Sequence, residues 1–167
     1  MQFPHPLSLL PEEIAREVRE GRAAIVGGAI RAHFERSPPR DVDVFFLNPT
    51  NYVSLVKKFD CAKKDNRIHT FTWQGTSIDL ILDSGCVSVE ICVERADFDI
   101  AAGCYYKKEF VLPDGFKEAV ETRRMRLLNV QYPQATYARF LRYKRYGYSC
   151  TASDVCAIMR AWHNQQR

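Results

Sequence analysis

The chain has 167 residues, of which 46% are hydrophobic and 26% are charged, a composition typical of one ordinary globular domain and not of a disordered or fibrous protein. Its longest apolar runs fall far short of the about 20 residues that a membrane helix needs, so we expect no membrane contact. The segment 1–10 lacks a basic stretch ahead of a long apolar run, which argues against a secretory signal and favours a cytoplasmic protein.

The net charge of +4 is small but unevenly distributed. The segment 117–145 has eight basic side chains against two acidic ones, a net +6, so the rest of the chain is negative overall. Its basic residues are Lys117, Arg123, Arg124, Arg126, Arg139, Arg142, Lys144 and Arg145. Such a concentration suggests a polyanionic partner, a nucleotide or a nucleic acid, although a solvated basic helix face is the simpler alternative.

Periodicity and turn residues predict helices and strands in a mixed order. In chain order we expect a helix over 10–20, a strand over 23–26, a helix over 29–36, a strand over 41–47 and a helix ending near 59. A hairpin of strands 68–73 and 77–82 follows, then a helix candidate over 86–94, strands over 98–106 and 109–112, a turn at 113–115, and two helices after Pro133, the second over 153–163. Mixed strands and helices first, with helices last, indicate an α+β fold.

The first chemical feature is the pair Gly27-Gly28, which ends a predicted strand and begins a predicted helix. Two glycines allow the backbone to approach a phosphate closely, and the free N–H groups of the helix would face that anion. Arg31, in the first turn, would add a charge-assisted contact. A Gly-Gly pair is also common in plain tight turns, so this feature alone is weak.

Two aspartates, Asp41 and Asp43, open the strand that follows. Strand side chains alternate between faces, so these two carboxylates point the same way. They repel each other unless a cation lies between them, and a hard divalent cation such as Mg²⁺ prefers oxygen ligands. The alternative is the acidic face of a solvated edge strand.

A third aspartate, Asp79, lies inside an otherwise apolar strand, where an unpaired carboxylate is costly. Asp83, farther along the same face, is the second candidate for this role, and a strand-end charge that reaches solvent is the simple alternative. Together with Asp41 and Asp43, Asp79 suggests a two-metal phosphoryl-transfer site. One ion would activate an attacking hydroxyl, and the other would neutralise the departing pyrophosphate.

The motif GGAIR at 27–31, followed after nine residues by DVDVF, resembles the head of the polymerase-β nucleotidyltransferase superfamily. It is nearest to the branch of tRNA CCA-adding enzymes and bacterial poly(A) polymerases. The segment RADFDIAA at 95–102 is similar to that branch's RRDFTINA motif, and the helix after Pro133 resembles the helix that reads the incoming base. The resemblance implies the following nucleotide-binding residues: Gly27, Gly28, Arg31, Arg95, Asp97, Arg139 and Arg142.

The resemblance also implies a fold and a reaction. The fold is a mixed sheet flanked by helices, with a nucleotidyltransferase head over 1–130 and a short helical neck over 131–167. The catalytic and metal-binding residues are Asp41, Asp43 and Asp79, with two Mg²⁺ ions, or Mn²⁺ in their place. They transfer a nucleoside monophosphate from a nucleoside triphosphate such as ATP to a hydroxyl acceptor.

The acceptor stays open at this point. An RNA or tRNA 3′ end fits the basic segment and the resemblance. Against it, Ala96, Asp99 and Ala101 replace residues with which the branch selects its substrate, and its tRNA-gripping body has no counterpart in the match. A protein hydroxyl or a small molecule, as in toxin or resistance enzymes, is the alternative, and a nucleotide-binding module without turnover is another. The oligomeric state is not indicated.

Overall fold

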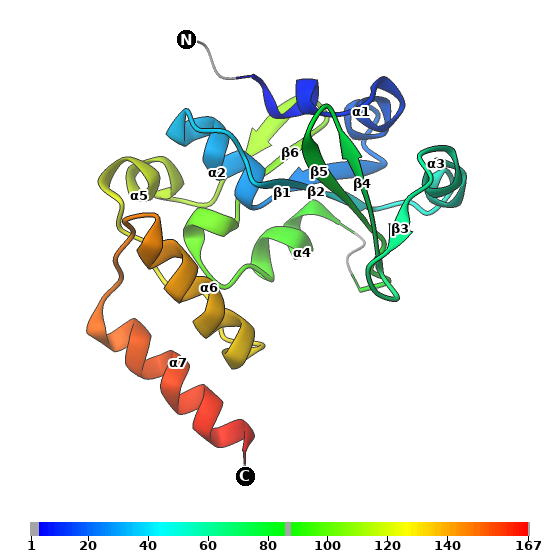
Figure 1. Ribbon diagram of the computed structural model, residues 1–167. Helices are drawn as coiled ribbons and strands as arrows, with labels where there is room; N and C mark the ends of the chain where they lie inside the picture. The colour runs from blue at the N-terminus through cyan, green and yellow to red at the C-terminus, as the bar shows by residue number, and fades with distance from the viewer. Residues whose placement is uncertain (1–3, 86–87, 167) are drawn as a thin grey trace.

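Seven strands form one mixed sheet in the computed structural model, which describes residues 4–85 and 88–166 (Figure 1). The strands are β1 (Ala23–Val26), β2 (Asp41–Phe46), β3 (Ala62–Lys63), β4 (Ile68–Trp73), β5 (Thr76–Ile81), β6 (Cys104–Tyr106) and β7 (Glu109–Val111). Their spatial order is β3-β4-β5-β2-β1-β6-β7. Strands β2 and β5 run parallel, and the other neighbouring pairs run antiparallel.

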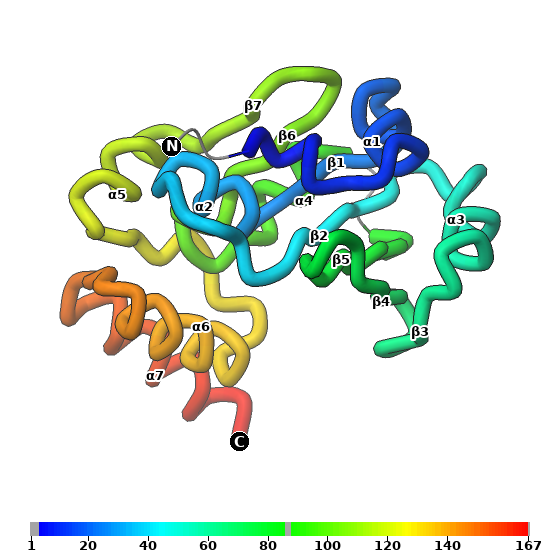
Figure 2. The backbone as a smooth tube through the Cα atoms, turned by 45° about the horizontal axis from the view of Figure 1, so that its top comes forward, coloured from blue at the N-terminus to red at the C-terminus, as the bar shows by residue number. Residues whose placement is uncertain are grey.

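The helices pack around this sheet and extend beyond it. They are the 3₁₀ turns η1 (Pro6–Leu9) and η2 (Asp99–Ala101) and the α-helices α1 (Glu12–Arg19), α2 (Gly28–Glu35), α3 (Tyr52–Lys58), α4 (Val89–Glu94), α5 (Phe116–Thr122), α6 (Pro133–Arg145) and α7 (Ala152–Gln165). Helices α6 and α7 form a hairpin beside the sheet, with the carboxyl terminus at its far tip (Figures 1 and 2). None of the described helices is long and apolar enough to cross a membrane.

The two faces of the sheet differ in how they are covered. Every second residue of β2, namely Val42, Val44 and Phe46, is buried in the main core with side chains of α1 and α2. The other residues of β2 share the opposite face with Val26, which is paired with Asp43 in the register of β1 and β2. Helix α4 covers only part of that face, through a small cluster around Val89. The open part carries the acidic residues.

Most of the expected elements are present in the expected order, so the predicted α+β arrangement is confirmed. The strands 23–26 and 68–73 have the expected bounds. Residues 86–87 of the helix candidate over 86–94 lie outside the described residues, and α4 begins after Ser88, whose hydroxyl accepts a hydrogen bond from the N–H of Ile91. The short strand β3 and helix α5 were not predicted.

A continuous strand over 98–106 was predicted and is wrong. Residues 99–101 form the turn η2, and regular pairing begins only at Cys104. The buried carboxylate of Asp99 explains the interruption, because Oδ1 accepts hydrogen bonds from the N–H groups of Ile100 and Arg126. An apolar run with an internal aspartate thus bends around that side chain instead of extending.

Candidate active site

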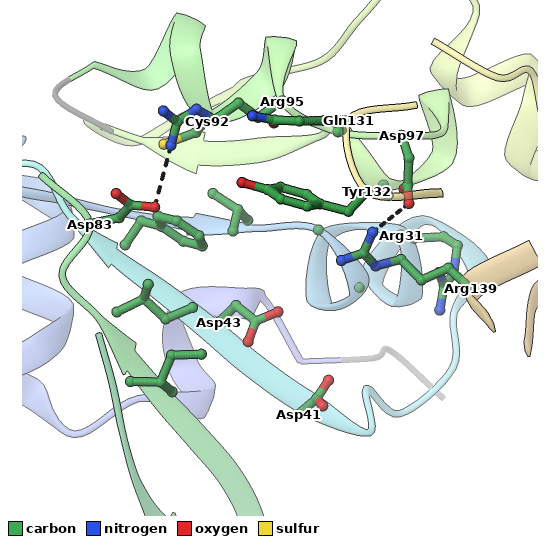
Figure 3. A pocket seen from close by; sticks show the side chains of 18 of the residues that line it. Arg31, Asp41, Asp43, Asp83, Cys92, Arg95, Asp97, Gln131, Tyr132 and Arg139 are labelled. Atoms are coloured by element: carbon green, nitrogen blue, oxygen red, sulfur yellow. Dashed lines mark hydrogen bonds and ion pairs between the residues drawn. The ribbon is translucent and has the colours of Figure 1, made fainter. Parts of the chain in front are cut away.

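A cavity of about 670 Å³ opens over the partly covered face of the sheet (Figure 3). It lies between the ends of β1 and β2, the start of α2, the end of α4 and helix α6. The predicted site residues that line it are Gly27, Gly28, Arg31, Asp41, Asp43, Arg95, Asp97, Arg139 and Arg142. Residues from segments more than 100 positions apart in the sequence therefore meet in one place.

The three aspartates of the sheet lie together: Asp41 and Asp43 line this cavity, and Asp79 lies next to Asp43 but is not among the lining residues. Asp43 and Asp79 are directly paired in the parallel register of β2 and β5, and Asp41 is two residues from Asp43 on the same face. Neighbouring strands lie about 5 Å apart, so these side chains, here called the carboxylate cluster, share one electrostatic environment. Burial, together with the charges of Asp41 and Asp79, raises the pKa of the Asp43 carboxyl to about 7.

Asp79 is the most deeply placed member of the cluster, at 3% exposure. Its Oδ2 accepts a hydrogen bond from Lys64 Nζ at 2.7 Å. Its Oδ1 is buried and has no hydrogen-bond partner among the described residues. A buried carboxylate oxygen without a donor is costly, so Oδ1 is available as a ligand for a cation.

Two side-chain cations from neighbouring loops already contact the cluster. Arg40 forms an ion pair with Asp41, and Lys64 forms one with Asp79. Within 4–85 and 88–166, no group of three or more histidine, cysteine or acidic side chains has the arrangement of a metal site. The donor chemistry nevertheless fits a hard divalent cation, because three carboxylates lie together and one buried oxygen is unpartnered.

The start of α2 forms the second wall of the cavity. Gly27 has φ 71°, a conformation that side chains other than glycine rarely adopt, and its N–H donates to the carbonyl of Gly103 at 2.9 Å. At Gly28, a Cβ would find no atom within 4 Å, so the first turn of the helix faces open space. The Gly-Gly pair therefore exposes a helix amino terminus to the cavity, as predicted.

Arg31 extends from the same helix and is held in place by aromatic rings. Its guanidinium lies 5.0 Å from the ring centre of Tyr143 and 5.5 Å from that of Tyr146. Its Nε lies 3.4 Å from Glu35 Oε1, one turn away. The side chain is almost fully buried, so it presents a fixed positive charge at the cavity wall.

Three further ion pairs lie in the cavity. Arg95 and Arg67 both contact Asp83 Oδ2, at 3.3 Å and 3.1 Å. Asp83, the second candidate for the third carboxylate, is thus bound by two arginines, whereas Asp79 lies next to Asp43. Asp97, expected near the sugar, and Arg139, expected near the base, form an ion pair with each other.

Several cavity residues have no signal in the sequence, because each comes from a loop whose position depends on the fold. These are Arg40, Arg67, Gln131 and Tyr132, with Lys64 in contact with Asp79 of the carboxylate cluster. Tyr132 is 63% exposed, yet its ring reaches into the cavity (Figure 3). In the sequence, Tyr132 is an isolated tyrosine before a predicted helix, and such a position does not indicate a site residue.

Two arginines of the basic segment 117–145 form ion pairs with acidic side chains of the same chain. Arg123 pairs with Glu35 at 2.6 Å, and Arg126 pairs with Asp99 at 3.1 Å. Arg124, Lys144 and Arg145 are exposed. Fewer charges are therefore free for a polyanionic partner than the composition of the segment suggests.

Solved structures with the same arrangement define the class of the fold. A tRNA nucleotidyltransferase complexed with a primer tRNA and an incoming ATP analogue matches 92% of this chain with a TM-score of 0.69 at 18% identity. A CCA-adding enzyme in its apo form matches 95% with a TM-score of 0.66 at 17% identity, and the Thermotoga maritima CCA-adding enzyme complexed with tRNA matches 93% with a TM-score of 0.65 at 16% identity. The fold is that of the polymerase-β-type nucleotidyltransferases, as the motifs implied.

A family model gives a more specific assignment than the fold does. The model of the Gabija anti-defense 2 (Gad2) family matches residues 7–123, and the chain belongs to this family. None of the curated proteins matches the sequence significantly. The chain spans 50%, 44% and 44% of the three solved structures named above, so about half of each enzyme lies outside the match.

Proposed function

We propose that this Gad2 protein is a metal-dependent nucleotidyltransferase that moves a nucleoside monophosphate from a nucleoside triphosphate to a hydroxyl group. The observation that carries the proposal is the carboxylate cluster, in which Asp43 is paired with Asp79 across two parallel strands. It lies at a cavity whose other wall is the glycine-lined start of α2. Acidic ligands and an anion-binding helix terminus on facing walls suit a metal–triphosphate complex.

The cluster would hold the divalent cations, Mg²⁺ or Mn²⁺. When bound, these ions supply charge neutralisation of the triphosphate and lower the pKa of the attacking hydroxyl. In the reaction the acceptor oxygen attacks the α-phosphorus, the bond to the bridging oxygen of the β-phosphate breaks, and pyrophosphate leaves. Asp79 assists removal of the hydroxyl proton in this proposal.

The rest of the cavity binds the nucleotide. The N–H of Gly28 at the start of α2 binds the triphosphate, Gly27 lets the phosphate approach the backbone closely, and the fixed guanidinium of Arg31 adds a charge-assisted contact. Arg95 and Asp97 lie toward the sugar, and Arg139 and Arg142 toward the base or the phosphates. Because α6 supplies these last two residues, a head over 1–130 and a neck over 131–167 form one site in this proposal.

We infer that the acceptor is a protein hydroxyl in the Gabija defence machinery. The family is an anti-defense family, and covalent nucleotide addition is a direct way to inactivate a defence protein. The internal ion pairs of Arg123 and Arg126 support this choice, since they reduce the charge available for an RNA strand. An RNA 3′ end is the second candidate, favoured by the likeness to a nucleotidyltransferase bound to primer tRNA.

The proposal is tested by label transfer. The protein is incubated with each α-³²P-labelled nucleoside triphosphate and Mg²⁺ or Mn²⁺, in the presence of purified Gabija proteins, an unrelated protein or total RNA. We expect label on a Gabija protein, with release of pyrophosphate and loss of both in Asp43→Asn. The matched control is Asp60→Asn, which changes an exposed aspartate whose φ of 47° asparagine tolerates. Label on RNA would select the second candidate, and no label on any acceptor would contradict the proposal.

A further inference from the structure

Lys64 approaches the carboxylate cluster from the turn between β3 and β4. Its backbone N–H donates to the carbonyl of Ile68 at 2.9 Å, which anchors the turn. Its side chain is 55% exposed, yet Nζ lies 2.7 Å from Oδ2 of the buried Asp79. The ammonium group thus connects solvent with the deepest carboxylate of the site.

The position of Lys64 places its charge near the whole cluster. Asp79 is paired with Asp43 in the sheet register, so a cation at Asp79 is also close to Asp43. An ordinary lysine ammonium is charged at neutral pH. At 2.7 Å from Asp79, Lys64 therefore partly offsets the repulsion within the cluster.

We propose that Lys64 is an internal counter-cation of the carboxylate cluster and competes with a divalent cation for Asp79. This inference rests on the proposed function, because it takes the cluster to be a metal site. A divalent ion at the cluster would lie within a few ångströms of the ammonium and be repelled by it. Since the Lys64 side chain is largely exposed, it can swing into solvent when a metal ion binds.

The unpartnered Oδ1 of Asp79 explains why the arrangement is suited to exchange. Lys64 satisfies Oδ2 only, and Oδ1 has no partner in the described part of the chain. A metal ion that replaces the ammonium would give Oδ1 the partner that it lacks. The ammonium keeps the acidic site compact without metal and leaves one ligand atom ready.

Lys64→Met tests the competition, because methionine keeps most of the aliphatic stem and removes the charge. We expect Mn²⁺ to bind the variant at least about tenfold more tightly than the wild type, since metal binding to the wild type must break the ion pair between Lys64 and the buried carboxylate of Asp79, which costs more free energy than this ratio requires. Lys63→Met is the matched control, because Lys63 is the exposed neighbour on β3 and its Mn²⁺ affinity should stay unchanged. Lys64→Gln, which keeps a hydrogen-bond donor, provides a second neutral variant if Lys64→Met folds poorly.

Binding is measured without nucleotide, from the electron paramagnetic resonance signal of free Mn²⁺ and by calorimetry, with the melting temperature of each metal-free variant as a folding check. Tighter binding in the neutral Lys64 variants, with Lys63→Met like the wild type, supports the proposal. Equal or weaker binding in those variants overturns it, and leaves Lys64 as a support for Asp79 in a metal site that still stands. Absence of Mn²⁺ binding in every variant overturns both the inference and the proposed metal site.

Discussion

At the scale of single residues, the electrostatics of the carboxylate cluster depend on how close its three carboxylates lie. Asp43 differs from its neighbours because no cation within residues 4–85 and 88–166 pairs with it directly, whereas Asp41 has Arg40 and Asp79 has Lys64. Burial and two adjacent negative charges therefore act on Asp43 with little compensation. Its raised pKa of about 7 is the clearest physical sign of a site built to receive positive charge.

The raised pKa of Asp43 predicts how stability changes with pH in metal-free protein. The folded pKa lies above the unfolded value of 3.8, so the folded state binds more protons between these values. The contribution of Asp43 to stability is present at about pH 4 and is lost as the pH rises toward 7. Asp43→Asn removes this loss, so the melting temperature of the variant minus that of the wild type should increase between pH 4 and pH 7 in EDTA. A constant difference would contradict the close approach of the carboxylates.

Asp79 and Asp83 provide a second prediction at this scale. Asp79 is paired with Asp43, whereas Asp83 is bound by Arg67 and Arg95. Asp79→Asn should lower the rate of nucleotidyl transfer by about 100-fold or more, since loss of a group that stabilises developing charge typically has this effect. Asp83→Asn should have a much smaller effect on the rate. Steady-state kinetics decides, and a larger loss in Asp83→Asn would transfer the role to that residue.

At the scale of elements, strand register and helix termini position the chemistry. The alternation in β2 predicts that Asp41 and Asp43 share a face, and the apolar strand around Asp79 predicts a second acidic position. The sequence also predicts the glycine-lined start of α2. These features are local, so the sequence pattern is sufficient for them.

Other parts of the site depend on long-range pairing and were not predictable. Lys64 reaches Asp79 only because β3 pairs with β4 and β4 with β5. The two-residue strand β3 has no periodicity to detect, and Tyr132 lies in an irregular loop. The ion pair of Asp97 and Arg139 joins residues 42 positions apart, so their separate expected roles did not reveal their contact.

Two glycine substitutions at the start of helix α2 should distinguish an effect on nucleotide binding from an effect on the stability of the fold. At Gly28 a Cβ meets no atom within 4 Å, so Gly28→Ala should leave the melting temperature unchanged or slightly higher. The added methyl group lies where the triphosphate approaches the backbone, so the KM for the nucleoside triphosphate should rise several-fold. Gly27→Ala should instead lower the melting temperature, because φ at this position is 71°. An unchanged KM in Gly28→Ala would place the triphosphate elsewhere.

At the scale of the whole molecule, the sheet and helices α2, α4 and α6 together line one cavity, which we propose to bind the nucleotide. The tRNA enzymes with this fold are about twice as long as the matched region, so the likeness covers about half of each of those enzymes. The Gad2 family assignment is what directs the proposed acceptor toward the Gabija defence. We therefore propose first of all that this cavity binds a nucleoside triphosphate together with a divalent metal ion.

A crystal structure with Mn²⁺ and a non-hydrolysable nucleoside triphosphate, with anomalous data at the manganese edge, would show whether the cavity binds both. We expect a manganese peak in contact with Asp43 and Asp79, the triphosphate against Gly27 and Gly28, and the Lys64 ammonium away from Asp79. Nucleotide bound outside the cavity, or a nucleotide-filled cavity without manganese at the carboxylate cluster, would contradict the account.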